Sequence, residues 1–344
     1  MKTLALLLAS ALVVGTIGKQ IAVPNRVGSI KGGDAFEAKA GIVHRQHRTA
    51  DGLRLHYRLV PAAQRAMRYR YQRNGNRVTF EFDMQRPAPE PVATRGSIVY
   101  LHGWGNNGQA MVPWAMALAD HGWQGVVLDL RGHGESGSAP AGYGTREAAD
   151  VTELMTALQA SGELPGPVFV FGNSYGAVTA LFAEQALRGR VSGIIAMQPF
   201  ATARGAIGGF IEMLRQSDAS TLSERLQRRA LRNVDMDAAI DDANRRLALD
   251  LRMVDVRPAV AASATCLLFV HADKDGVFPL ADTQAMAAST PMGVMATVPG
   301  EHHLTLPMRI DWLATALQDW VQATAARGSS ACPQFTLPAA PVPD

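Results

Sequence analysis

The sequence predicts a doubly wound α/β domain with a mostly parallel sheet and a small helical cap insertion. Nearly all-apolar runs of strand length recur from residue 97 onward. Such runs suit strands that are buried on both faces of a parallel sheet. Stretches with helical spacing of apolar residues lie between them, so strands and helices alternate with short connections. One connection, over residues 200–258, is much longer and has helical spacing.

Six runs are predicted to be the strands of this sheet: Ser97–Leu101, Gly125–Asp129, Val168–Phe171, Val191–Met197, Cys266–His271 and Val294–Val298. Apolar stripes at helical spacing predict the helices between and after them: Met111 to Leu118, Ala148 to Leu158 and Ile310 to Val321. Upstream, residues 51–60 and 68–84 alternate as strands do. Asn74-Gly75 is a tight-turn signal, so Met67–Phe82 is predicted to be a hairpin.

The chain has 344 residues, of which 47% are apolar, so it can bury a large core. The patterns above divide it into four segments, the first of which is residues 1–18. Residues 19–94 form an N-terminal extension that contains the hairpin, although 19–50 give no clear secondary structure. Residues 95–326 form the main domain, with 200–258 inserted as a cap over the C-terminal edge of the sheet. Residues 327–344 are rich in Pro, Ala and Ser and are predicted to be a flexible tail.

Residues 1–18 predict export or anchoring. Lys2 precedes an apolar run from Leu4 to Ile17, which is short for a transmembrane span. Small residues could precede a cleavage site after Gly18, and an uncleaved membrane anchor is the alternative. We therefore expect an exported protein, periplasmic or secreted, or one held at a membrane through this segment alone. The net charge of +3 is spread along the chain, so no nucleic-acid partner is expected.

The chain has two cysteines. Cys266 opens an apolar run and is interpreted as a buried thiol, whereas Cys332 lies in the Pro-rich tail. In an oxidising compartment the two could form a bridge that pins the tail. Neither has the neighbours of a catalytic or metal-bound thiol.

The strongest chemical signal is a Gly-x-Ser-x-Gly motif, Gly172 to Gly176, that follows an apolar strand and precedes a helix-like run. A serine on a sharp strand-to-helix turn has strained backbone angles, and glycines two positions away on either side remove the clashes. The hydroxyl of Ser174 then projects from the sheet edge above a helix N-terminus, which favours a developing negative charge. The motif predicts Ser174 as a nucleophile.

A serine nucleophile needs a base and an acid, and both types follow at the ends of later strands. Asp273 and Asp275 follow the strand ending at His271, and His302 and His303 follow the strand ending at Val298. The chain order Ser, Asp, His is the order expected for this scaffold. The residues alone leave both choices open: Asp275 or Asp273, and His302 or His303.

Residues 95–325 resemble the α/β-hydrolase superfamily, in its serine esterase, lipase and peptidase-like members, in several independent segments. Leu101-His102-Gly103-Trp104-Gly105 is similar to the family's oxyanion loop, and Asp129 to Gly137 is similar to its Asp-x-Arg-Gly-His-Gly-x-Ser loop. In the family the acid commonly lies four residues before a proline, which implies Asp275 ahead of Pro279. The base usually follows closely on a glycine and precedes a bulky residue, which favours His302 over His303. The chain departs from many members at Asn173 and Ala177, and neither departure points to a substrate.

The resemblance and the mechanism imply an oxyanion hole made by the backbone N–H groups of Trp104 and Tyr175. No cofactor is expected, and no cluster of His, Cys, Asp or Glu has metal-ligand spacing. The remaining histidines receive structural interpretations: His102 and His133 brace loops, His271 is partly buried, and His44, His47, His56 and His121 are solvated.

The expected function is a serine hydrolase, carboxylesterase-like, that transfers the acyl group of a small-molecule ester to Ser174 and then to water. A peptidase or amidase and a thioesterase are alternatives on the same scaffold, because the motif serves all of them. A lipase is a further alternative, and a non-catalytic binding protein is a rival from another class. Ser174 counts against a dehalogenase or epoxide hydrolase on this scaffold, which would need a carboxylate at that position.

Overall fold

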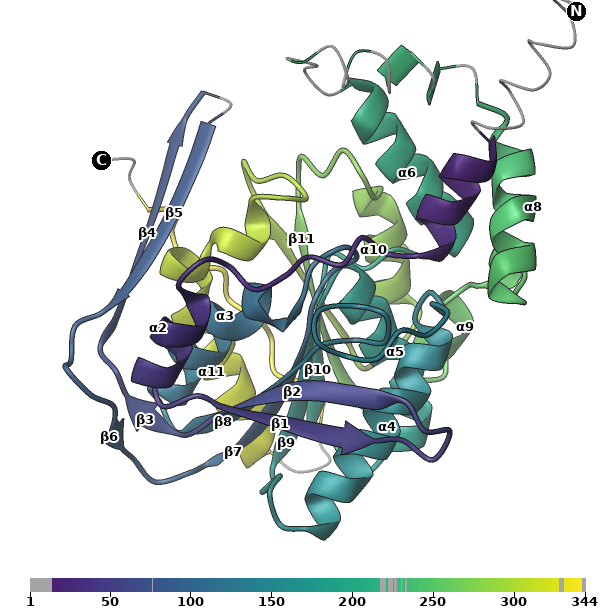
Figure 1. Cartoon of the computed structure of the whole chain (residues 1–344). Helices are drawn as coiled ribbons and strands as arrows, with labels where there is room; N and C mark the ends of the chain where they lie inside the picture. Colours follow the sequence, from purple (N-terminus) through teal and green to yellow (C-terminus); the bar gives the residue numbers. More distant parts are fainter. Residues whose placement is uncertain are drawn as a thin grey trace, which may run out of the picture.

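The computed structural model describes residues 14–75, 77–216, 221, 225, 228–229, 231–232, 234–327 and 331–341. Its centre is an eight-stranded sheet flanked by helices on both faces (Figure 1). The strand order is β1-β2-β8-β7-β9-β10-β11-β12. The first three strands pair antiparallel, and every later pairing in the sheet is parallel, so the predicted fold class is confirmed.

The sheet strands have the following bounds: β1 Val43–Arg48, β2 Arg54–Val60, β7 Gly96–Leu101, β8 Trp123–Leu128, β9 Val168–Asn173, β10 Gly193–Met197, β11 Cys266–Ala272 and β12 Gly293–Val298. All six runs predicted from the sequence are therefore strands. Strands β7, β10 and β11 are buried along their whole length, and β9 is buried except at Asn173. This burial explains why they are nearly all apolar rather than alternating with polar residues.

Side chains of each central strand alternate between two cores. In β9, Val168 and Val170 point into one core, and Phe169 and Phe171 point into the other. The first core lies under α4 (Thr145–Ala160) and α5 (Tyr175–Leu187), and the second lies under α3 (Val112–Ala119) and α11 (Ile310–Ala326). The strand period of two thus divides the apolar residues between the two faces of the sheet.

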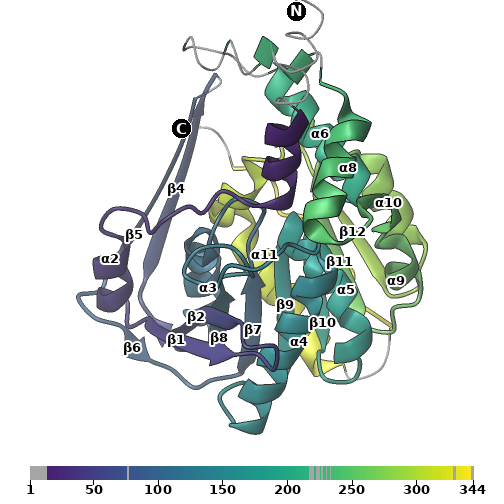
Figure 2. The same ribbon diagram turned by 45° about the vertical axis from the view of Figure 1, so that its right-hand side comes forward.

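The helices of the long connection are α6 (Ala203–Gln216), α8 (Met236–Leu247) and α9 (Arg257–Ala261), with the 3₁₀ turn η2 (Leu251–Met253). The buried residues of α6 and α8 belong to the same core as α4 and α5. Figure 2 shows α6 and α8 at one end of the sheet, beside the helical segment formed by residues 14–22. Other elements of the fold are short: α2 Gly33–Lys39, η1 Gly108–Met111, α10 Leu280–Ala288 and η3 Leu306–Met308.

The predicted hairpin is present. Strands β4 (Met67–Asn74) and β5 (Arg77–Met84) pair antiparallel across the turn at Gly75, whose φ is +60°. The pair projects as a long arm beside α3 (Figure 1), and the short strands β3 (Ala63–Gln64) and β6 (Glu90–Pro91) close its base. Tyr69 anchors the arm by donating its hydroxyl hydrogen to the Pro113 carbonyl at 2.9 Å.

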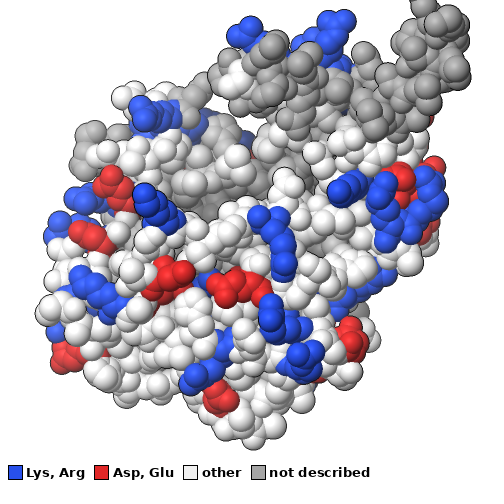
Figure 3. All heavy atoms as spheres, viewed as in Figure 1, with Lys and Arg blue, Asp and Glu red and all other residues white. Residues whose placement is uncertain are grey.

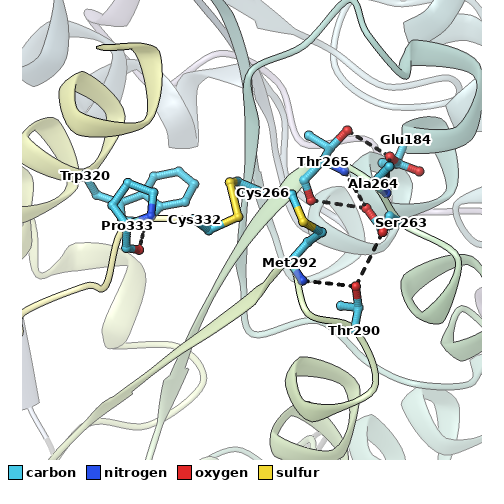
Figure 4. The surroundings of a disulfide bond; sticks show 10 residues. All are labelled: Glu184, Ser263, Ala264, Thr265, Cys266, Thr290, Met292, Trp320, Cys332 and Pro333. Carbon is cyan, nitrogen blue, oxygen red and sulfur yellow. Dashed lines mark hydrogen bonds between the residues drawn. A yellow bond between two sulfur atoms is a disulfide. The ribbon is translucent and has the colours of Figure 1, made fainter. Parts of the chain in front are cut away.

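The C-terminal tail differs from the flexible segment that its composition predicts. A disulfide joins Cys332 to Cys266 at the start of β11, which resolves the alternative that the sequence left open. Trp320 of α11 donates its indole N–H to the Pro333 carbonyl at 3.0 Å beside this bond (Figure 4), and Trp312 donates to Pro338. Two tryptophan donors and one covalent bond therefore hold a segment whose own sequence has no regular structure.

Two further expectations concern the N-terminus. Most of the predicted signal or anchor segment, residues 1–13, lies outside the described residues. Residues 14–22 form a helical segment whose Ile17 and Ile21 are buried. Among the described residues, no helix is long and apolar enough to cross a membrane. Residues 19–50, which gave no clear prediction, contain the end of this helix, α2 and β1.

Candidate active site

Ser174 lies on the turn between β9 and α5, where the backbone adopts φ 54° and ψ −111°. A Cβ atom on Gly172 would lie 2.2 Å from the Gly176 carbonyl oxygen, and one on Gly176 would lie 2.2 Å from the Leu101 carbonyl oxygen. Both glycines are therefore required by backbone contacts, as the motif predicts. The turn is held by the Ser174 N–H, which donates to the Met197 carbonyl at 2.7 Å.

A chain of hydrogen bonds joins Ser174 to a histidine and a carboxylate. Oγ of Ser174 lies 3.1 Å from Nε2 of His303, and Nδ1 of His303 lies 2.8 Å from Oδ2 of Asp275. His303 is 5% exposed and Ser174 is 4% exposed, so water has little access to either bond. The three side chains come from the ends of β9, β11 and β12, which meet at one edge of the sheet.

The preference for His302 is wrong on this geometry. His302 is turned away from Ser174, and its Nδ1 lies 2.8 Å from the Lys274 carbonyl oxygen. The chain turns at Gly300, whose φ of +79° favours glycine, and a second turn follows it. In the family the base follows closely on a glycine, and both His302 and His303 satisfy that rule, so it does not decide between them.

The choice of Asp275 over Asp273 agrees with the geometry. Oδ1 of Asp275 accepts hydrogen bonds from the N–H groups of Val277 and Phe278, at 2.8 and 2.9 Å. Asp273 instead accepts a hydrogen bond from the Gly300 N–H. Among the residues that the structure describes, its carboxylate bonds to neither Ser174 nor His303. Asp273 lies on the turn after β11 and links that turn to the one at Gly300.

Burial raises the pKa of Asp275. The hydrogen bond and electrostatic interaction with His303, together with the two backbone N–H groups, lower it by a larger amount, so the net pKa lies below the usual value. Asp275 is therefore ionised at neutral pH and accepts the Nδ1–H of His303. With its proton on Nδ1, His303 has a lone pair on Nε2, and this lone pair is directed at the hydroxyl of Ser174. The arrangement can remove a proton from that hydroxyl.

His271 is a neighbour that the sequence did not connect with the site. Its Nε2 lies 3.4 Å from Oδ2 of Asp275, its Nδ1 lies 3.0 Å from the Thr283 hydroxyl, and it is fully buried. Burial lowers its pKa, so it is neutral and adds no charge beside Asp275. It fills the space behind the carboxylate.

The two predicted oxyanion donors lie on either side of Ser174. Tyr175 is the first residue of α5, and Trp104 follows Gly103, at which an added Cβ would lie 3.6 Å from the Ser174 Cβ. Within the described part of the chain, neither the Trp104 nor the Tyr175 N–H donates to a protein acceptor. Their side chains pack together, with ring centroids 5.1 Å apart.

His102 and His133 brace the loops beneath these rings. His102 accepts the Leu130 N–H at its Nε2 and lies 2.8 Å from the Gly103 carbonyl through Nδ1. His133 lies 2.9 Å from the Arg131 carbonyl through Nδ1, and its ring meets that of Trp104 edge to face at 5.5 Å. Both histidines hold the loop that carries Trp104, which is the structural role predicted for them.

A cavity of about 380 Å³ opens above Ser174. Its lining is mostly apolar and comes from three regions: the oxyanion loop and its aromatic neighbours, helix α6, and the N-terminal segment. The N-terminal contribution consists of Ile17, Gln20, Ile21, Asn25 and Val27. This contribution was missed, because the sequence assigned residues 1–18 to export and gave no structure to residues 19–50.

The fold and the site together define an α/β scaffold with a buried serine on the turn between β9 and α5. A family model described as the alpha/beta hydrolase family matches residues 98–337, and the chain belongs to this family. Membership of the family supports a hydrolase.

Known proteins resemble the chain over shorter or more distant stretches. The Bacillus subtilis protein YqkD is 29% identical over 30% of this chain and 33% of its own length. The non-heme chloroperoxidase CPO-A1 of Kitasatospora aureofaciens is 39% identical over 18% of this chain and 22% of its own length. The chain thus spans a third or less of these relatives.

Solved structures match over most of their length. The esterase Pf2001 of Pyrococcus furiosus has a TM-score of 0.61 at 15% identity, with 90% of this chain and 98% of the esterase covered. A thermophilic esterase from Thermogutta terrifontis has a TM-score of 0.53 at 16% identity, covering 83% of this chain and all of its own. At these identities the likeness concerns the fold.

Proposed function

We propose that the protein is a serine hydrolase that cleaves a carboxylic ester through an acyl-enzyme on Ser174. The observation that carries this proposal is the hydrogen-bonded chain from Asp275 through His303 to Ser174 at the floor of an apolar cavity. A hydroxyl becomes a competent nucleophile when a neutral imidazole accepts its proton and a carboxylate orients that imidazole.

The reaction follows from these positions. Nε2 of His303 takes the hydroxyl proton as Oγ of Ser174 attacks the ester carbonyl, and the amides of Trp104 and Tyr175 donate to the developing oxyanion. His303, now an imidazolium stabilised by Asp275, passes its proton to the leaving alcohol. Water then enters, His303 removes its proton, and the second tetrahedral intermediate releases the acid and restores Ser174.

The cavity supports a substrate with an apolar acyl group of moderate size. Ile207, Phe210 and Ile211 of α6 line one side, and Ile17 and Ile21 line another. Apolar walls favour a hydrocarbon chain, and burial of the chain excludes water from the reacting carbonyl. Helix α6 therefore acts as the cap predicted for residues 200–258, with the N-terminal segment as a second wall.

Export remains a proposal with one supporting observation. The Cys266–Cys332 disulfide suits an oxidising compartment such as the periplasm or the extracellular space. Processing after Gly18 would remove Ile17 from the cavity wall, whereas an intact N-terminus would keep it. An uncleaved segment, serving also as a membrane anchor, is compatible with the described contacts of residues 14–22.

The test is hydrolysis of p-nitrophenyl esters with acyl chains of two to twelve carbons, measured for the wild type and for Ser174→Ala. We expect turnover of one range of chain lengths by the wild type and a loss of about 10³-fold or more in kcat for the variant, because the triad acts as a unit. An aminopeptidase substrate and an acyl thioester in the same assay distinguish the peptidase and thioesterase alternatives. Full activity in folded Ser174→Ala would remove Ser174 as the nucleophile.

A further inference from the structure

A cluster of histidines and carboxylates lies away from Ser174, at the β1 edge of the sheet. It consists of His44 on β1, His56 on β2, and Glu135 on the loop that follows β8. One ligand atom from each of the three lies within 4.8 Å of the others. Nδ1 of His44 is 3.0 Å from Nε2 of His56, and that Nε2 is 3.7 Å from Oε2 of Glu135.

The outer nitrogen of each imidazole is bonded to a buried carboxylate. Nδ1 of His56 lies 2.8 Å from Oδ2 of Asp129, and Nε2 of His44 lies 2.8 Å from Oε2 of Glu37. Asp129 is fully buried, and Glu37 is 2% exposed. A carboxylate accepts hydrogen bonds, so each histidine carries its proton on the outer nitrogen.

Asp129 is anchored by backbone donors as well. Its Oδ1 accepts the Gly108 N–H at 2.6 Å, and its Oδ2 accepts the Glu135 N–H at 2.9 Å. Arg58 donates to Glu37 at 2.9 Å and to Asp129 at 3.1 Å, which fixes both carboxylates in place. The imidazoles are thus oriented by anchored anions and cannot turn away.

With the outer nitrogens bonded to these carboxylates, the inner nitrogens of His44 and His56 direct two lone pairs at each other across 3.0 Å. Such a contact is repulsive unless a cation lies between them. A shared proton satisfies two nitrogens, but it gives no role to the Glu135 carboxylate on the open side of the pair. A metal ion uses all three groups.

We propose that His44, His56 and Glu135 form a binding site for a divalent transition-metal ion of the Zn²⁺ class. Two imidazoles and one carboxylate are a common ligand set for this ion, and a tetrahedral site with bonds of about 2.0–2.1 Å separates its ligands by about 3.3 Å. Asp129 and Glu37 supply the outer hydrogen bonds that metal-bound histidines almost always make. His44 and Glu135 are exposed, so water can complete the coordination.

Spacing along the chain does not reveal this site, because His44 and His56 are twelve residues apart on paired strands and Glu135 lies far along the chain. The prediction that His56 is solvated is wrong, since it is 1% exposed. The antiparallel pairing of β1 with β2 brings the two imidazoles together. The site joins the edge strand to the loop that carries His133, so it is expected to stiffen that loop.

The experiment is calorimetric titration of tag-free, metal-stripped full-length protein with Zn²⁺, together with thermal unfolding. The wild type should bind one ion per chain in the micromolar range or tighter, and its Tm should rise with Zn²⁺ concentration by mass action. His44→Gln should abolish this binding, and Glu135→Gln should weaken it about 10-fold or more, because each removes a ligand. Both positions are exposed, so these variants should fold.

His47→Gln is the matched control, since His47 lies on the same strand but makes none of the contacts of the site. It should bind Zn²⁺ as the wild type does. Absence of Zn²⁺ binding by the wild type would overturn the proposal. The contact between Nδ1 of His44 and Nε2 of His56 would then be explained by a proton that the two nitrogens share. Equal binding by His44→Gln and the wild type would also overturn the proposal, because the ion would then occupy another site.

Discussion

At the residue scale, the two adjacent histidines after Gly300 have different contacts. His303 lies between Ser174 and Asp275, whereas His302 contacts the Lys274 carbonyl. The sequence indicated that one of the pair faces the serine. The resemblance favoured His302, but the direction of each side chain depends on the turn at Gly300, which spacing along the chain does not describe.

Paired substitutions test this assignment. We expect His303→Ala and Asp275→Asn to lower kcat by about 10³-fold or more, since both belong to one catalytic unit. Their neighbours, His302→Ala and Asp273→Asn, should retain activity within about tenfold, because they contact only backbone groups. Ester kinetics and circular dichroism on all four variants provide the measurement. A deeper loss in His302→Ala than in His303→Ala would contradict the assignment.

Other residue-scale features were predictable because their causes are local. The requirement for glycine at positions 172 and 176 comes from contacts within one turn and its neighbouring strand. The role of His271 behind Asp275, and the pairing of His44 with His56, depend on packing between segments. Spacing along the chain carries no signal for such contacts.

At the element scale, the strands and the hairpin were predictable from periodicity and turn residues, whereas the N-terminal segment was not. Ile17 ends an apolar run that suits an export signal or an anchor, and Ile21 lies just beyond that run, so composition gave no hint that both are buried. Their burial depends on α6 and α8, which come some two hundred residues later. An added Cβ on Gly18 would lie 2.4 Å from an oxygen of Asp242 in α8, so the helical segment packs closely against the cap.

The two walls of the cavity should set the acyl-chain preference. Ile207→Ala on α6 and Ile21→Ala on the N-terminal segment should each shift the optimum toward longer esters. The expected gain in relative kcat/KM is about fourfold for each methylene newly accommodated, because burying a CH₂ contributes about 0.8 kcal/mol. The measurement is kcat/KM across the p-nitrophenyl ester series.

Leu251→Ala is the control for the cavity variants. Leu251 is fully buried within the same insertion but does not line the cavity. Its replacement should lower the free energy of unfolding by about 2–5 kcal/mol and leave the chain-length profile unchanged. If stable variants at Ile207 and Ile21 keep the wild-type profile, the preference lies elsewhere in the site.

At the scale of the whole molecule, both ends of the chain are attached to the central domain. The N-terminal segment shares a core with α6 and α8, and the disulfide ties the C-terminal tail to β11. Lys and Arg side chains are scattered over the face shown in Figure 3, among acidic groups, and form no single basic stripe there. The tail could not be placed from the sequence, because its order depends on Cys266 and on two tryptophans of α11.

Acid stability is a property of the whole fold that the buried histidines should control. Burial lowers the pKa of His102, His133 and His271, to about 3 for His133. In the unfolded chain a histidine gains its proton near pH 6.5, so the unfolded state binds more protons below that pH. Stability should be fully present above about pH 6.5 and fall toward pH 3, with a slope of up to about 1.4 kcal/mol per pH unit for each buried histidine.

His133→Asn tests this dependence, because an asparagine amide can still donate to the Arg131 carbonyl but does not titrate. Urea unfolding at pH 7.5, 6.0 and 5.0 should show a shallower loss of the free energy of unfolding for the variant than for the wild type. Parallel slopes for the two proteins would mean that His133 takes up its proton equally in the folded and unfolded states.

Covalent labelling tests whether Ser174 is a nucleophile that His303 activates. A fluorophosphonate reacts with a serine hydroxyl only when a neighbouring base activates it. Intact-mass and peptide analysis should find one adduct per chain, on Ser174, formed at similar rates in the wild type and His302→Ala. The adduct should be absent from Ser174→Ala and form at least about 10²-fold more slowly in His303→Ala. An adduct on another residue, or equal labelling rates in His303→Ala and the wild type, would contradict these roles for Ser174 and His303.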